Sequence, residues 1–166
     1  MPEDSLPDRP SMPFVWSDRS GGPRDPELFD GIVLRRSVAY IIDVVILLGV
    51  TGFLWTLVVL TLGLLWAVAA VLTPIVPLVY HTALIGGRHS ATLGMRVTGV
   101  EIRRLDGGRP DIALAFLQTA LFYATVTLTS MLILLVALFN DRGRCLHDWL
   151  TGTMAVRTAA VERLGA

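Results

Sequence analysis

The chain has 166 residues, of which 53% are hydrophobic and only 17% are charged, and its mean hydropathy is +0.62. The formal net charge is zero, so no basic excess indicates nucleic-acid binding. The single cysteine, Cys145, excludes an internal disulfide and any zinc site built from cysteine pairs. Apolar residues in long unbroken blocks are typical of a membrane protein rather than of a soluble domain.

Residues 1–31 form a polar region that is rich in proline and in charges of both signs. Such a segment cannot bury enough apolar surface to offset the conformational entropy lost on folding. It also lacks the apolar core of a secretory signal. The sequence therefore predicts a disordered tail, then a membrane domain over residues 32–157 and a short C-terminal tail over residues 158–166.

The first apolar stretch predicts two helices that cross the membrane. No Asp, Glu, Lys or Arg occurs from Val44 to Ile85, and one crossing needs about 20 residues. We expect spans over residues 32–57 and 62–84, joined by a short turn that makes them antiparallel. Pro74 and Pro77 predict a bend in the second span.

A polar, arginine-rich loop separates these spans from a third apolar block. The alternation in MRVTGVEIRRL indicates a short strand, and DGG indicates a tight turn. The third block predicts a span over residues 112–139. The segment after it places Leu146, Trp149 and Leu150 at helical spacing, as at a membrane interface. The expected fold is an all-α integral membrane protein with a bundle of about three transmembrane helices.

The distribution of arginines predicts a multi-pass plasma-membrane protein with a cytoplasmic N-terminus. Arg35, Arg36 and the loop arginines flank the first two spans, whereas the turn between those spans carries no charge. Arg142 and Arg144 argue for a cytoplasmic C-terminal segment, which three full crossings contradict. The third block is thus either one span, an interfacial helix followed by a span, or a re-entrant pair.

Asp43 is the main candidate functional residue, because an ionised carboxylate inside a bilayer costs at least a few kcal/mol. Arg36 shares its helix face but is expected to extend toward the lipid headgroups. Either the carboxyl stays protonated, or a basic side chain from another segment pairs with it. The candidates for that partner are His81, Arg142, Arg144 and His147.

Three motifs resemble the RDD family of membrane proteins. RRSVAYIID resembles the family's opening segment, TLGMR resembles its central T-x-G-K signature, and RGRCLHDWLTGTMAV resembles its closing H-D-x-x-x-G-T segment. Met95 stands where lysine is usual, and Gln118 lies near the place of a frequent arginine. The resemblance implies that the arginine and two aspartates of the family name are Arg36, Asp43 and Asp148. The candidate auxiliary residues are His81, His147, Thr92 and Gly94.

The sequence supports two functions. The first is transport of a small ion or solute that uses Asp43. We expect a homo-oligomer in that case, because so few spans enclose little space. The resemblance is compatible with cation or proton transport, which has been suggested for some members. The second is a non-transporting membrane module that assembles or regulates partner proteins. No nucleophile accompanies the pair His147 and Asp148, so we expect no enzymatic activity. No cofactor or metal site is expected.

Overall fold

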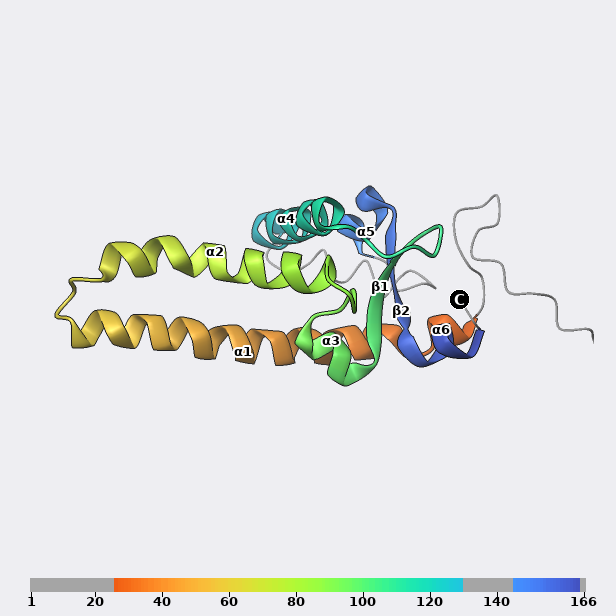
Figure 1. Ribbon diagram of the computed structural model, residues 1–166, viewed down its shortest axis with the longest axis horizontal. Coiled ribbons are helices and arrows are strands. Elements are labelled where there is room, and N and C mark those ends of the chain that lie inside the picture. The colour runs from red at the N-terminus through yellow and green to blue at the C-terminus, as the bar shows by residue number, and fades with distance from the viewer. Residues whose placement is uncertain (1–25, 130–144, 165–166) are drawn as a thin grey trace, which may run out of the picture.

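The computed structural model describes residues 26–129 and 145–164, and it divides into a long helical hairpin and a smaller base (Figure 1). The hairpin consists of α1 and α2, and the base contains the shorter elements. The elements in chain order are η1 (Pro26–Leu28), α1 (Ile32–Leu60), α2 (Trp66–Ile85), α3 (Leu93–Thr98), β1 (Val100–Arg104), α4 (Ile112–Thr129), α5 (Leu146–Thr151), β2 (Thr153–Arg157) and α6 (Thr158–Leu164).

The hairpin has the length and composition of two membrane spans. Both α1 and α2 are long and apolar enough to cross a bilayer, and most of their side chains are not buried within the protein. Large apolar residues such as Leu48, Phe53 and Val59 are exposed, as they are on a helix that faces lipid. The observed helices lie within a few residues of the predicted spans 32–57 and 62–84. Pro74 and Pro77 lie inside α2, and its bend stays a prediction.

A two-stranded antiparallel sheet joins the central loop to the C-terminal segment. β1 pairs with β2 so that Val100 faces Arg157 and Arg104 faces Thr153. The strand predicted within MRVTGVEIRRL begins only at Val100, because Thr92 caps a short helix, α3, that includes the MRVT residues. The tight turn at DGG is present, with the Gly107 N–H donating to the Arg104 carbonyl at 2.9 Å. β2 was not predicted.

Residues that were predicted to belong to the two tails form part of the fold. Leu28 is completely buried and packs in one apolar cluster with Met154 and Val161. The predicted tail 1–31 is thus wrong over residues 26–31, and residues 1–25 lie outside the described residues. The predicted C-terminal tail is wrong over residues 158–164, which form α6 and contribute to the same cluster. Burial of apolar side chains at the base stabilises both segments.

The third apolar block begins at the base of the hairpin, and the described segment that follows it, from Cys145 on, also lies at the base. Its first residue, Ile112, lies against Gly86 at the end of α2, and Asp148, just beyond the block, contacts Arg36 near the start of α1. One complete crossing would separate these two ends, so three full crossings do not fit the structure. In Figure 1, α4 lies beside α2 and is strongly foreshortened, so the axis of α4 points away from that of the hairpin. Residues 130–139 of the predicted span lie outside the described residues.

Candidate functional site

Asp43 is buried, with 2% of its surface exposed, and accepts three hydrogen bonds from uncharged donors. Its Oδ1 accepts from the Tyr80 hydroxyl at 2.7 Å and from the Gly94 N–H at 2.9 Å. Its Oδ2 accepts from the Thr92 hydroxyl at 2.6 Å. Hydrogen bonds to an ionised acceptor are stronger than those between neutral groups. These three donors therefore offset much of the cost of burying the carboxylate.

The expectation of a basic partner for Asp43 is wrong for the residues that the structure describes, none of which forms an ion pair with it. His81 instead places its Nδ1 3.0 Å from the Pro77 carbonyl and 3.2 Å from the Tyr123 hydroxyl. Arg142 and Arg144 lie outside the described residues. A sequence signal was present for one of the donors, because the hydroxyl of a tyrosine in an apolar span, such as Tyr80, usually finds a hydrogen-bond partner.

The T-x-G sequence of the central motif is explained by its contacts with α1. Thr92 caps α3 by accepting from the Met95 N–H at 3.2 Å while its hydroxyl donates to Asp43. Gly94 packs directly against α1, where a Cβ atom would overlap the Ala39 carbonyl oxygen. Only glycine allows this approach. The Met95 side chain packs on the apolar core, so this geometry does not need the lysine that is usual in the family.

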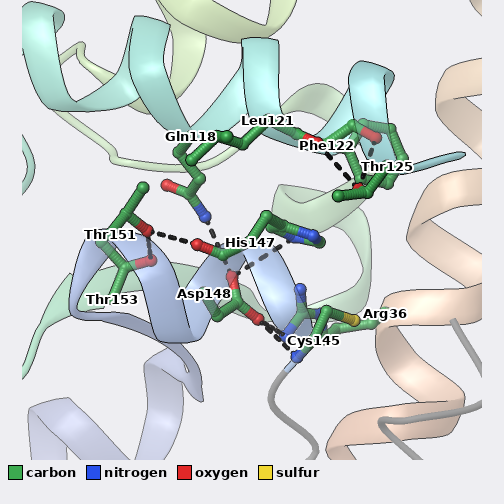
Figure 2. A network of polar contacts seen from close by, with 10 residues as sticks. All are labelled: Arg36, Gln118, Leu121, Phe122, Thr125, Cys145, His147, Asp148, Thr151 and Thr153. Atoms are coloured by element: carbon green, nitrogen blue, oxygen red, sulfur yellow. Dashed lines mark hydrogen bonds and ion pairs between the residues drawn. The ribbon is translucent and has the colours of Figure 1, made fainter. Parts of the chain in front are cut away.

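Arg36 and Asp148 form a buried ion pair. The Arg36 Nη1 lies 2.6 Å from Asp148 Oδ2, and the side chains are 14% and 0% exposed. Asp148 also accepts from the Gln118 side-chain amide at 3.1 Å and from the Cys145 N–H at 3.1 Å (Figure 2). The expectation that Arg36 extends to the headgroups is wrong, because β1–β2 pairing brings α5 back to the start of α1.

The surroundings of Asp148 keep it ionised. Burial alone raises the pKa of this carboxyl, but Arg36, the neighbouring His147 and the hydrogen bonds outweigh burial and hold the pKa below its usual range. Asp148 is also the N3 residue of a capping box with Cys145 at the start of α5. Burial raises the pKa of the Cys145 thiol, which is unfavourable for a reactive nucleophile.

His147 lies beside this ion pair in its neutral form. Burial lowers the pKa of its ring, so the 3.4 Å contact of Nε2 with Asp148 Oδ1 is a weak hydrogen bond at neutral pH. Potential metal-binding atoms of Cys145, His147 and Asp148 lie within 4.8 Å of one another. The guanidinium of Arg36 already balances the charge of Asp148, so the ion pair and the capping box account for this cluster and we assign no metal to it.

A cavity of about 370 Å³ connects the two carboxylate sites. It lies among α1, α2, α4 and α5, with apolar walls. Among the described residues, its hydrogen-bonding side chains include Arg36, Asp43, His81, Gln118, Thr119 and His147. Thr119 was not among the candidate site residues predicted from the sequence, because threonines in apolar helices are equally typical of helix packing. The structure thus brings all the predicted motif residues to one region, with Thr92 and Gly94 behind Asp43.

Among the described residues, two apolar helices joined by a short turn have the length and composition of membrane spans, as expected of a helical membrane protein. The chain belongs to the RDD family, whose family model matches residues 31–152. This match confirms the resemblance and includes Arg36, Asp43 and Asp148. No curated protein and no solved structure matches the chain.

Proposed function

We propose that the protein transports a small ion or solute across the plasma membrane, with the cavity as its binding site. The observation that carries this proposal is the cavity itself, which joins Asp43 to the surroundings of Arg36 and Asp148. A chamber of this size with a few polar groups in apolar walls is typical of a small-molecule site.

The position of Asp43 along α1 supports access from one side of the membrane. The helix rises about 25 Å between Asp43 and Leu60 at 1.5 Å per residue, and the hydrocarbon layer is about 30 Å thick. If the turn after Leu60 marks one boundary, Asp43 and the cavity lie near the other. The arginines of the base support a cytoplasmic location for that boundary and for the N-terminus.

Transport by this chain requires more helices than one copy supplies, because the two candidate spans among the described residues enclose little space. We propose that the protein works as a homo-oligomer or with another membrane protein, in contact with the lipid bilayer. The proposal assigns no chemical reaction to the site, so the residues that line the cavity serve only to bind and position the solute.

Flux measurements in proteoliposomes test this function. We expect the wild type to move radiolabelled or fluorescently detected ions or solutes faster than empty vesicles, and Asp43→Asn to fold but lose this flux. Asp106→Asn is the matched control, because it removes an exposed carboxylate, about half accessible, at the turn after β1. Unchanged flux in Asp43→Asn would reject the role given to Asp43.

The alternative function is a non-transporting module that assembles or regulates membrane partners. One observation favours it: Asp43 and Asp148 already have internal partners and hold α3 and α5 against α1. In that case wild-type vesicles show no flux for any solute. Asp148→Asn then weakens cross-linking to membrane partners because α5 detaches from α1, whereas Asp106→Asn leaves cross-linking unchanged.

A further inference from the structure

Three buried polar atoms around the cavity have no hydrogen-bond partner among the described residues. They are Gln118 Oε1, Thr119 Oγ1 and His147 Nδ1, and the three residues are 3%, 2% and 4% exposed. Leaving such an atom unsatisfied destabilises the folded protein. All three residues line the same cavity. A bound molecule that satisfies several of these atoms at once would recover that cost.

The hydrogen-bonding character of these atoms can be read from their neighbours. The Gln118 Nε2 faces Asp148, which as a carboxylate only accepts, so Oε1 is a free acceptor (Figure 2). The His147 Nε2 faces the same carboxylate, so in the neutral ring Nδ1 carries a lone pair. The Thr119 hydroxyl is able to donate or accept. Two of the three positions therefore require a donor from the ligand.

The charged groups of the cavity are occupied. Asp43 accepts from three neutral donors, and Arg36 and Asp148 neutralise each other. A free cation would have to compete for carboxylate oxygens that already accept hydrogen bonds. A free anion would have to displace Asp148 from Arg36. Neutral, donor-bearing solutes match the atoms that remain.

We propose that the cavity binds a small neutral solute with several hydrogen-bond donors, of the polyol class, at Gln118, Thr119 and His147. This inference rests on the proposed function and specifies its substrate class. Val33, Ile85 and Phe122 line the same space and contact the C–H faces of such a molecule, while its hydroxyls meet the three polar atoms. The volume of about 370 Å³ accommodates a polyol with a few water molecules.

Saturation-transfer NMR with the full chain in lipid nanodiscs tests this inference, with erythritol as the probe. We expect saturable erythritol binding that sodium and potassium chloride do not displace. 1,4-Dioxane, which has acceptors but no donors, should bind much more weakly. Equal binding of dioxane, or displacement of erythritol by sodium, would overturn the assignment, as would a failure of erythritol to bind.

A matched set of threonine variants locates the binding site. Thr119→Val removes a hydroxyl that has no protein partner and keeps the side-chain shape, so the protein should fold and bind erythritol roughly two- to tenfold more weakly, the effect of one hydrogen bond. Thr119→Ser keeps the hydroxyl and should restore binding. Thr82→Val is the control, because Thr82 Oγ1 is also buried and unpartnered but is not among the described residues that line the cavity. Equal weakening by Thr82→Val and Thr119→Val would place the polyol elsewhere.

The flux and binding experiments distinguish failure of the proposed transport function from failure of the proposed polyol site. Erythritol binding without flux of any solute rejects transport and retains this inference. Cation flux without erythritol binding retains transport and rejects the polyol class.

Discussion

Asp43 and Asp148 are both buried carboxylates at the base of the hairpin, but different kinds of groups surround them. Asp148 faces the guanidinium of Arg36 at 2.6 Å, whereas Asp43 faces two hydroxyls and a backbone N–H. In the first site one charge is balanced by another. In the second, oriented dipoles from α2 and from the T-x-G motif stabilise the carboxylate. Removing the charge should therefore lower the stability much more at Asp148 than at Asp43.

The largest effect is expected at the ion pair. Asp148→Asn leaves the buried guanidinium of Arg36 without its counter-charge, which typically lowers the free energy of unfolding by about 3–5 kcal/mol. Thermal unfolding of the purified protein in detergent measures this loss. The double variant Arg36→Met with Asp148→Leu removes both charges and should recover much of the stability. If the double variant is no more stable than Asp148→Asn, the unpaired charge of Arg36 is not the main cause of the stability lost in Asp148→Asn.

The next effect concerns the docking of α3 on α1. Gly94→Ala places a methyl group onto the Ala39 carbonyl oxygen and should destabilise the protein by about 1–3 kcal/mol, as overpacking does. Gly49→Ala is the matched control. Gly49 lies within α1, and no atom lies near the Cβ that this substitution adds. That variant should be neutral or slightly stabilising. Equal unfolding temperatures for the two variants would contradict the close packing described here.

Asp43→Asn should lower the free energy of unfolding by less than Asp148→Asn or Gly94→Ala does, by about 1 kcal/mol. The asparagine oxygen is able to keep the bonds from Tyr80 and Gly94, and its amide is able to donate to the Thr92 hydroxyl in place of accepting from it. Asp43→Leu is the contrasting variant, because it leaves all three donors unsatisfied. Unfolding measurements that find Asp43→Asn as damaging as Asp148→Asn would show that a basic partner of Asp43 exists after all.

The smallest effect is a dependence of stability on pH that comes from His147. Because burial lowers the pKa of this ring below 6.5, the unfolded chain takes up a proton more readily than the folded one. Stability is therefore full above pH 6.5 and should fall by about 1 kcal/mol by pH 5.5. Asp148, whose pKa is held below 3.8, stays ionised in this range. His147→Gln should flatten the profile relative to wild type, whereas His89→Gln, at an exposed position, should not.

The local features of this fold were predictable, and the long-range ones were not. Composition alone predicts the hairpin, since uncharged apolar stretches of that length are typical of membrane spans. The partner of Arg36 depends instead on β1 and β2, two five-residue strands about fifty positions apart, and no local pattern indicates that pairing. The same holds for Leu28, which is buried only because β2 and α6 lie beside it. The motif residues were found by resemblance, and their contacts required the structure.

The pairing of β1 with β2 has a consequence for biosynthesis. β1 and Arg36 emerge from the ribosome early, but Asp148 and β2 follow only after the whole third apolar block has been made, seconds later at typical elongation rates of about 5–20 residues per second. During that interval β1 presents an unpaired edge and Arg36 lacks its carboxylate. The hairpin therefore inserts as an incomplete intermediate, which is completed when residues 148–157 supply Asp148 to Arg36 and β2 to β1. A ribosome that stalls before this point leaves a membrane-inserted chain with both features exposed.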